Sequence, residues 1–371
     1  MTKKKAIVSV TNDLFTDQRV RKVCDFLVEE GYDITLVGRL LKNSQPINDR
    51  PYRTKRFKLW FNKGVLFYAN YNLRLFFFLL FNKADLLLAN DLDTLYANHC
   101  ARKFKKKCRL IYDSHEYYCG VPELVERPRI QKFWRAIEKR TVPKVDVMYT
   151  VNESIADIYR KEYEREVFVV RNISDFKGLP EGKSRLELGL PEDKKVVVLQ
   201  GAGINIERGA EELIEAIQLV DNAILIFVGD GDVIPQLKNL VSENKLSEKV
   251  YFFGKRPYEE LMQFTLVSDL GVSLDKDTNI NYRFSLPNKI FDYIHAGIPV
   301  LVSNLPEVKH VVEKYEVGLV IDSHEPKEIA RKIKMIVDNT ALSDSFIANT
   351  KTAAATLTWA NEKKTLKRIY S

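Results

Sequence analysis

The sequence lacks the features that mark disulfide-bonded, zinc-binding and membrane-spanning proteins. Its 371 residues include only four cysteines, which show neither a CxxC pair nor the Cys/His spacing of a zinc site. We therefore expect a cytoplasmic protein in a reducing compartment, without a bound metal. The most apolar run covers residues 73–81. It is far shorter than the roughly 20 residues that span a bilayer, which argues against an integral membrane protein. The chain passes from MTKKK directly into an apolar strand, so no cleaved signal peptide is expected.

Basic residues are concentrated in the first half of the chain. Residues 1–170 hold 32 lysines and arginines against 21 acidic residues, which leaves 26 against 29 for the rest. The excess lies in three patches that mix basic and aromatic residues, at 53–58, 101–109 and 127–135. Peripheral contact with an anionic membrane face and a solvated basic surface both fit this composition. No helix-turn-helix, RNA-binding or zinc motif accompanies the patches, so we do not expect a nucleic-acid partner.

Short apolar runs alternate with helical patterns along the whole chain. The runs are typical of buried parallel strands, and helices such as 18–31 lie between several of them. This alternation predicts two doubly wound α/β domains. The Gly-, Pro- and charge-rich stretch 171–194 separates a domain 1–170 from a domain 171–354. The expected strands are 6–10, 33–38, 85–90, 109–113, 146–151, 167–170, 194–201, 223–229, 249–254, 269–274, 298–303 and 317–321.

The functional residues should follow the strands, because ligands bind at the carboxyl ends of such sheets. After the strand 194–201, Gly201, Gly203 and Arg208 precede a helix, an arrangement that suits a diphosphate. The alternative is a Gly-rich turn with a surface arginine. A dinucleotide fingerprint is disfavoured, since Ile206 stands where GxGxxG needs its last glycine. Two later strand ends add weaker nucleotide-binding candidates. Gly229 lies in a glycine cluster that a tight turn would also explain, and the segment with Arg256 could offer backbone groups to a base.

The segment SLPNKIFDYIHAGIPV (285–300) places opposite charges at the start of a short helix. Pro287 suits that start, and Asn288 and Lys289 then lie in the first turn. A lysine there opposes the helix dipole unless an anion also binds. Asp292 lies three residues further along, on roughly the same face. A phosphate beside Lys289 and a sugar hydroxyl beside Asp292 would account for both charges. The alternative is an i,i+3 surface ion pair.

These segments resemble the retaining family-four glycosyltransferases of the GT-B fold, the "group 1" glycosyltransferases. The resemblance is carried by 285–303, by GAGINIERGAEELIEAI (201–217) and by the ending LTWANEKKTLKRIYS, and it covers essentially the whole chain. It implies two Rossmann-like domains facing across a cleft, with hinges near 171–194 and 355–360. It also implies that a helix over 355–371 packs back onto the N-terminal domain. The implied reaction moves a sugar from a nucleoside-diphosphate sugar to an acceptor with retained configuration, without cofactor or metal.

The resemblance also assigns roles to residues of the C-terminal domain. By position, the ribose-binding glutamate of the family falls on Asp292, and the diphosphate-binding lysine falls on Arg208. The family's arginine before that lysine falls on Gly203, so Lys289 is expected to supply the missing charge. A second family glutamate falls on Phe284. Its place is expected to be taken by backbone amides and Ser285.

The resemblance implies that the N-terminal domain receives the acceptor, a glycan or a lipid-linked molecule. Family members often carry an active-site histidine on the loop that corresponds to 111–118. His115, next to Glu116, would there donate a hydrogen bond to the sugar or the leaving phosphate. Arg19 is expected to contact the acceptor or a phosphate, with Asp17 holding it in place, and Asp91 lies at another strand end.

Two alternative functions stay open at this point. A GT-B epimerase or phosphorylase would act on the sugar nucleotide alone, or on a glycan with free phosphate. A non-catalytic scaffold that binds membranes or nucleic acid would explain the basic half, but it would leave Arg208, Lys289 and Asp292 without a role. We favour a metal-independent hexosyltransferase of cell-surface polysaccharide or glycolipid synthesis, in which fixed cations stabilise the leaving diphosphate.

Overall fold

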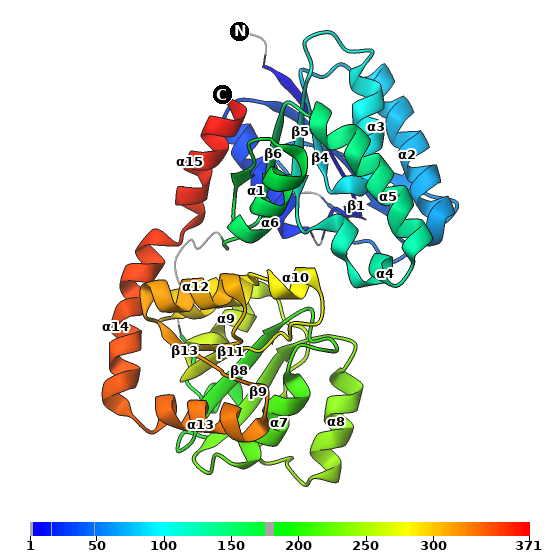
Figure 1. Ribbon diagram of the computed structural model, residues 1–371. Coiled ribbons are helices and arrows are strands. Elements are labelled where there is room, and N and C mark those ends of the chain that lie inside the picture. Colours follow the sequence, from blue (N-terminus) through cyan, green and yellow to red (C-terminus); the bar gives the residue numbers. More distant parts are fainter. Residues whose placement is uncertain (1–2, 16, 48, 175–181) are drawn as a thin grey trace. The chain divides into compact units, whose positions relative to one another are not determined.

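The computed structural model describes residues 3–15, 17–47, 49–174 and 182–371. Two compact units divide the chain. Unit 1 comprises Met1–Arg171 and Lys363–Ser371, and unit 2 comprises Asn172–Glu362. Each unit contains one parallel sheet (Figure 1). The middle of the predicted hinge 171–194, residues 175–181, lies outside the described residues.

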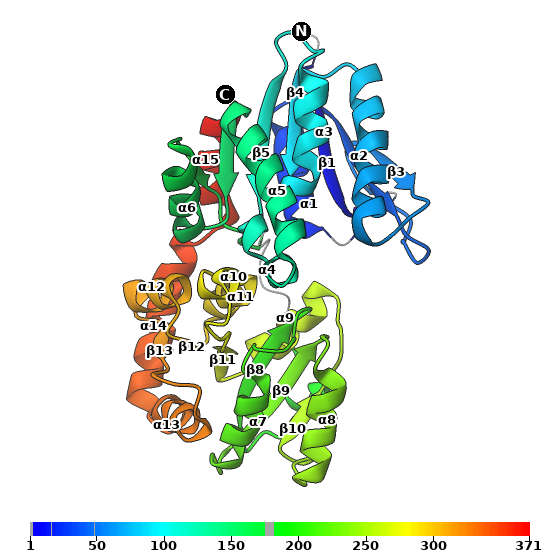
Figure 2. The same cartoon turned by 45° about the vertical axis from the view of Figure 1, so that its right-hand side comes forward.

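Unit 1 is built on a seven-stranded sheet in the order β3-β2-β1-β4-β5-β6-β7. Figures 1 and 2 show α2, α3 and α5 on one face of this sheet and α1 and α15 on the other. Helix α6 packs beside α5, where the Tyr159 hydroxyl donates to Oε1 of Glu138 at 3.3 Å. The strands are β1 Lys5–Asp13, β2 Asp33–Leu40, β3 Arg53–Lys58, β4 Leu86–Asn90, β5 Arg109–Ser114, β6 Val147–Thr150 and β7 Phe168–Val169. The helices are α1 Gln18–Glu29, α2 Gly64–Phe81, α3 Leu92–Arg102, α4 Pro122–Val125, α5 Pro128–Thr141 and α6 Glu153–Tyr163.

The twelve expected strands all occur, but β3 was missed. The sequence RTKRFK of β3 was interpreted only as a basic patch, and it in fact pairs in parallel with β2, with Arg53 opposite Thr35. It forms the edge of the sheet. Charged side chains are common on edge strands because they discourage pairing with other chains. A hydrophobic pattern therefore cannot reveal this strand.

Helix α2 is longer than the apolar run 73–81 suggests. It begins at Gly64, and its 18 residues are long and apolar enough to cross a membrane by length and composition alone. Only 22% of it is buried inside the structure. One such helix is weak evidence for a membrane span, and the expectation of a non-integral protein stays a prediction.

Unit 2 is built on a six-stranded sheet in the order β10-β9-β8-β11-β12-β13. The strands are β8 Lys195–Gly201, β9 Ala223–Gly229, β10 Val250–Phe252, β11 Leu270–Ser273, β12 Val300–Val302 and β13 Gly318–Val320. The helices are α7 Ala210–Gln218, α8 Ile234–Glu243, α9 Tyr258–Leu266, α10 Ile280–Arg283, α11 Asn288–Ala296, α12 Pro306–Tyr315, α13 Pro326–Val337 and α14 Thr340–Thr356, and α15 Trp359–Tyr370 follows.

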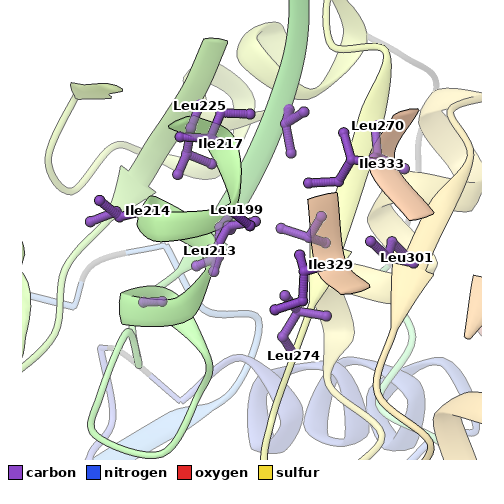
Figure 3. Close-up of a cluster of buried hydrophobic side chains, with 14 of the residues drawn as sticks. Leu199, Leu213, Ile214, Ile217, Leu225, Leu270, Leu274, Leu301, Ile329 and Ile333 are labelled. Atoms are coloured by element: carbon purple, nitrogen blue, oxygen red, sulfur yellow. The ribbon is translucent and has the colours of Figure 1, made fainter. Parts of the chain in front are cut away.

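The sheet of unit 2 separates two hydrophobic cores. Successive residues of a strand point to opposite faces, so Val197 and Leu199 of β8 enter one core while Val196 and Val198 enter the other. The first core packs against α7 and α13, as Figure 3 shows for Leu213 and Ile333. The second packs against α9, α11 and α12. Helices on both faces of a parallel sheet confirm the predicted doubly wound architecture.

The chain ends with two helices where the sequence suggested one. Leu357 ends α14 with a non-helical backbone, and α15 begins at Trp359. Residues 363–371 belong to unit 1. There the Tyr32 hydroxyl donates to the carbonyl oxygen of Tyr370 at 3.2 Å, and the Arg109 guanidinium donates to the carbonyl oxygens of Ile369 and Ser371.

Candidate functional site

The strands β8 and β9 each end in a glycine, Gly201 and Gly229. Gly201 has φ +136° and Gly229 has φ +151°, a backbone region that other residues rarely adopt. A Cβ on Gly229 would lie 1.8 Å from the carbonyl oxygen of Gly201, so the strand ends touch and exclude any side chain there. A Cβ on Gly201 would lie 3.8 Å from Cε of Lys289. The glycine turn therefore lies directly beside the lysine of the next segment.

Arg208 is fixed by two neighbouring side chains. Its Nη1 donates to Oδ2 of Asp275 at 2.8 Å, and its Cζ lies 4.5 Å from the centroid of the Tyr282 ring. Asp275 follows β11, is buried, and also accepts a hydrogen bond from Ser285 Oγ at 3.0 Å. Its other oxygen, Oδ1, has no partner among the described residues. Asp275 thus joins Arg208 and Ser285, which the sequence placed on separate segments.

Gly209 determines how closely this loop approaches the sheet. It precedes α7 with φ +71°, and a Cβ there would lie 2.4 Å from the carbonyl oxygen of Leu274. Leu274 is the residue before Asp275. The absence of a side chain at Gly209 therefore permits the contact between Arg208 and Asp275.

Lys289 is the second residue of α11, and Asn288 is exposed at the start of the helix. Burial lowers the pKa of the Lys289 ammonium group, and the positive charge of Arg208 lowers it further. The carboxylate of Asp275 acts in the opposite direction and raises this pKa. Two cations thus lie near a single carboxylate, which leaves the cluster net positive. A bound anion would offset the cost of holding Lys289 charged at a helix N-terminus.

Asp292 lies one turn further along α11 and is buried. Its Oδ1 accepts hydrogen bonds from Ser174 Oγ and Tyr258 Oη, both at 2.9 Å, and its Oδ2 accepts one from Gln200 Nε2 at 3.1 Å. A ribose hydroxyl would have to join or displace these donors. The role of Asp292 in ribose binding therefore stays a prediction.

The remaining two donor-site candidates lie on other loops. Gly203 has open space where a Cβ would point. Arg256 is exposed, donates from Nε to the carbonyl oxygen of Phe253 at 3.0 Å, and lies 3.8 Å from the carboxylate of Glu260. These contacts stay within its own loop and helix, so the structure does not link Arg256 to the Arg208 cluster.

In unit 1, His115 lies between two carboxylates at the ends of β4 and β5. Its Nδ1 is 3.2 Å from Oδ2 of Asp91, and its Nε2 is 3.4 Å from Oδ2 of Asp113. Its backbone N–H donates to Oδ1 of Asp91 at 2.8 Å. Burial favours the neutral ring, but the two carboxylates raise the pKa of His115 to about 9. The imidazole is therefore positively charged at neutral pH.

Asp91 has a strained backbone. Its φ of 58° and ψ of 163° fall in a region that is usually restricted to glycine. Such strain persists where surrounding contacts fix the residue, and it is common at functional sites. The two contacts of Asp91 with His115 fix its position in this way.

The sequence analysis expected Asp17 to hold Arg19 in place, but in the structure Asp113 holds it. Its Nε and Nη2 donate to the Asp113 carboxylate, the latter at 2.7 Å, and its Nη1 donates to the carbonyl oxygen of Val170 at 2.8 Å. The side chain is 4% exposed. Asp17 instead caps α1 by accepting from the N–H of Val20. Arg19 and His115 thus share Asp113 as a partner, and the predicted contact of Arg19 with an acceptor or a phosphate stays a prediction.

Two further acidic residues flank this cluster. Asp93 is buried, and its Oδ2 accepts from Thr11 Oγ1 at 2.6 Å. Burial and, to a smaller extent, the charge of Asp91 raise the pKa of Asp93 to about 7. Glu116 has an exposed side chain, and its backbone carbonyl accepts from Ser114 Oγ. In the described ranges, His, Cys, Asp and Glu side chains form no group of three or more that could hold a metal ion.

Two family models match consecutive parts of the chain. The model of Glycosyltransferase Family 4 matches residues 17–175, and the model of glycosyl transferases group 1 matches residues 182–353. The chain belongs to the group 1 glycosyltransferases. The two matches contain the His115 cluster and the Arg208 cluster, respectively.

Curated relatives of this group 1 glycosyltransferase are distant. It is 24% identical over 288 residues to an uncharacterized glycosyltransferase of Methanocaldococcus jannaschii, covering 72% of this chain and 69% of that protein. It is 27% identical over 186 residues to the lipopolysaccharide core biosynthesis glycosyltransferase LpsD of Rhizobium meliloti, covering 50% of this chain and 51% of that protein. The chain thus spans about half the length of the second relative.

Solved structures confirm the GT-B fold of this group 1 glycosyltransferase. Sucrose-phosphate synthase of Thermosynechococcus elongatus superposes with a TM-score of 0.81 at 17% identity, covering 99% of this chain and 98% of that one. Anabaena HepE, solved in complex with UDP-glucose, gives a TM-score of 0.72 at 15% identity and covers 99% of both chains.

Sequence reasoning missed three residues that organise the two clusters. Asp275 and Asp113 both lie at the carboxyl ends of expected strands, so the rule that selected Asp91 would also have selected them. Tyr282 follows no strand directly, and nothing in the sequence indicated that its ring would lie under Arg208.

Proposed function

We propose that this group 1 glycosyltransferase moves a sugar from a nucleoside-diphosphate sugar to an acceptor, with retained anomeric configuration and without a metal ion. The observation that carries the proposal is the Arg208–Asp275–Lys289 cluster beside the touching strand ends at Gly201 and Gly229. Fixed cations beside glycine backbone at strand ends, next to helix N-termini, suit a diphosphate.

In this proposal, the cluster stabilises the leaving group. When the bond between the anomeric carbon and the diphosphate breaks, negative charge grows on the departing oxygen. Arg208 and Lys289 neutralise that charge, and preorganised groups of this kind cost little reorganisation during the reaction. Asp275 orients Arg208 and limits the net positive charge of the cluster. Asp292 is proposed to hold the ribose.

The acceptor reacts on the face that the diphosphate leaves. The acceptor oxygen bonds to the anomeric carbon, the bond to the phosphate oxygen breaks, and the acceptor's proton passes to that phosphate oxygen. His115, charged at neutral pH, donates a hydrogen bond to the sugar or to the leaving phosphate. Asp91 and Asp113 keep the imidazole protonated and oriented.

We further propose that the acceptor is a glycan or a lipid-linked molecule, used in polysaccharide or glycolipid synthesis at the cytoplasmic membrane face. The name of the Rhizobium relative, which refers to lipopolysaccharide core biosynthesis, supports this acceptor class. The complexes of HepE with UDP and with UDP-glucose support a nucleoside-diphosphate sugar as donor.

The first test measures thermal unfolding with UDP, GDP, ADP, CMP or NAD, with EDTA present. One nucleoside diphosphate should raise the melting temperature, since it binds only the folded protein. The shift should disappear in Arg208→Ala and remain in Arg331→Ala, which removes an exposed arginine of α13 that pairs with Glu328. A shift with NAD alone, or no shift with any nucleotide, would contradict the donor site.

The second test measures transfer with the sugar nucleotide that this screen selects. Product should require an acceptor, and nuclear magnetic resonance should show the same anomeric configuration in donor and product. Conversion of the donor without any acceptor would favour the epimerase alternative, and inversion would contradict the proposed same-face attack.

A further inference from the structure

Helix α2 has an apolar outer face as well as an apolar inner face. Phe67, Tyr71, Leu75 and Leu79 are buried, at intervals of four residues. The exposed positions between them repeat with the same spacing and are apolar too: Val65, Ala69, Leu73, Phe77 and Phe81. A surface helix of a water-soluble protein normally carries polar residues on its outer face. Leu73 is nevertheless 57% exposed and Phe81 is 79% exposed.

An apolar pocket opens beside this outer face, within unit 1. Its volume is about 630 Å³, which is in the range of small-molecule sites. Figures 1 and 2 show α2, α3 and α5, which contribute most of its wall, on the same face of the sheet. Its lining includes Ala69, Leu73 and Phe76 of α2, Ala97 and Cys100 of α3, and Trp134 of α5.

Basic residues are frequent near the apolar face, although the pocket lining includes Glu123 as well as Arg127. The exposed side of α5 carries Arg129, Lys132, Lys139 and Arg140 around Phe133, which is 58% exposed, whereas Glu138 of the same helix is buried. The segment 103–107 holds four lysines around Phe104. The Phe104 ring is 69% exposed and lies 6.4 Å from that of Phe76. Positive charge beside exposed aromatic and aliphatic groups suits the headgroup region of an anionic bilayer.

We propose that the outer face of α2, together with α5 and the 103–107 segment, docks unit 1 on an anionic membrane, and that one hydrocarbon chain of a membrane lipid enters the α2–α3–α5 pocket. This goes beyond the transfer reaction and does not depend on it, since none of the proposed donor or acceptor residues belongs to this surface. A second copy of the chain is a poorer occupant, because a two-fold interface would bring like charges together.

The docking is tested by co-sedimentation of the full chain with phosphatidylcholine vesicles that contain phosphatidylglycerol. We expect binding that weakens with salt and with removal of phosphatidylglycerol. The double variant Leu73→Asp/Phe77→Asp should bind at least about tenfold more weakly, since it removes apolar contact and adds negative charge. The matched control is Leu186→Asp in unit 2, where Leu186 is 72% exposed. Equal binding by the double variant and the control would overturn the docking surface.

Entry of a chain into the pocket is tested through Trp134, which lines it. In a Trp60→Phe variant the remaining tryptophans are Trp134 and the buried Trp359 of unit 2. Vesicles with brominated acyl chains should quench part of the fluorescence, and soluble glycerophosphoglycerol should not. Vesicle binding without quenching would overturn chain entry. Concentration-dependent dimers that the double variant abolishes, with no vesicle binding, would assign the face to self-association.

These outcomes are separable from failure of the proposed function. The substituted residues are exposed, so the double variant should keep its melting temperature and its nucleotide-dependent rise. Loss of vesicle binding with an intact nucleotide response would then report on the docking surface alone.

Discussion

The charge of His115 predicts how the activity of this enzyme depends on pH. Because the pKa of His115 is raised to about 9, the imidazole should stay protonated at neutral pH. We expect kcat/KM to be flat around pH 7–8 and to fall as pH rises through about 9. His115→Asn should lower kcat by roughly 100-fold, comparable to the loss of one fixed hydrogen-bond donor. It should also remove the alkaline limb of the profile. If kcat/KM of the His115→Asn variant still falls near pH 9, the fall is caused by a group other than His115.

The same pKa fixes the sign of a folding effect. The folded-state pKa of His115 lies above the ordinary value of about 6.5, so its ion pairs contribute stability that is fully present below that pH. This contribution is lost as pH rises through about 9. Urea unfolding of the wild type and His115→Asn at pH 6.5 and above pH 9 separates this effect from the catalytic one.

The buried pair of Arg19 and Asp113 predicts a large loss of stability when one partner is removed. Burial alone would raise the pKa of Asp113, but the charges of Arg19 and His115 lower it to about 2. Asp113→Asn leaves the buried Arg19 charge unpaired, and we expect it to lower the free energy of unfolding by about 3–5 kcal/mol. Asp157→Asn is the matched control, because it breaks an exposed pair with Arg160 that contributes less than about 1 kcal/mol. Equal effects in urea unfolding would contradict the prediction.

At the scale of single residues, the sequence could indicate candidates but not their partners. Strand ends identified His115 and Asp91, because the carboxyl ends of a parallel sheet share one edge. The partner of Arg208 lies 67 residues away and that of Arg19 lies 94 residues away. No local pattern relates residues at such separations. The nearby Asp17 was therefore assigned to Arg19, although it serves as the cap of α1.

At the scale of elements, we predict that the loop between β8 and α7, which carries Arg208, tolerates no side chain at position 209. Ala at this position would combine an unfavourable φ of +71° with a Cβ 2.4 Å from the carbonyl oxygen of Leu274. Gly189 is a matched control, because it has the same φ but a Cβ there would meet nothing within 4 Å. Gly189→Ala should cost about 1–2 kcal/mol from backbone strain alone. Gly209→Ala should cost more, and it should also weaken nucleotide binding by displacing Arg208.

Both variants are measured by urea unfolding and by the nucleotide-dependent rise in melting temperature. Equal losses of stability, with nucleotide binding intact in Gly209→Ala, would show that the loop can move away from β11 without consequence. The prediction would then be wrong.

Elements with a strong apolar pattern could be predicted, and those without one could not. Buried strands such as β9 are apolar throughout, so their bounds were found from the sequence alone. The edge strand β3 carries mostly basic residues and has no such pattern. The first turns of α2 mix polar and apolar residues, so only its last nine residues stood out. The outer face of that helix was recognisable only once the buried positions were known.

At the scale of the whole molecule, the two units divide the proposed chemistry. The Arg208 cluster belongs to unit 2, whereas the His115 cluster and the α2–α3–α5 pocket belong to unit 1. The excess of basic residues also lies in the chain segment that forms unit 1. The alternation of strand-like and helical segments predicted this division into two α/β domains, because it recurs in both halves of the chain.

The last residues of the chain should stabilise unit 1 without affecting nucleotide binding. The Tyr370 ring is buried, lies 6.1 Å from that of Phe26, and its hydroxyl is 3.1 Å from that of Tyr149. Tyr370→Ala should lower the free energy of unfolding by about 3–5 kcal/mol, as expected when a large core side chain is removed. Tyr370→Phe keeps the ring and should cost only about 1 kcal/mol, for one hydrogen bond.

Urea unfolding of the two Tyr370 variants measures these losses, and nucleotide titration below the unfolding range checks that the donor site is intact. The nucleotide affinity should be unchanged in both, because Arg208, Lys289 and Asp292 all belong to unit 2. Wild-type stability in Tyr370→Ala would mean that the last turn of α15 contributes little to unit 1. A loss of nucleotide affinity in Tyr370→Phe would instead show that the two units are coupled through α15, since that variant leaves the packing of the ring in place.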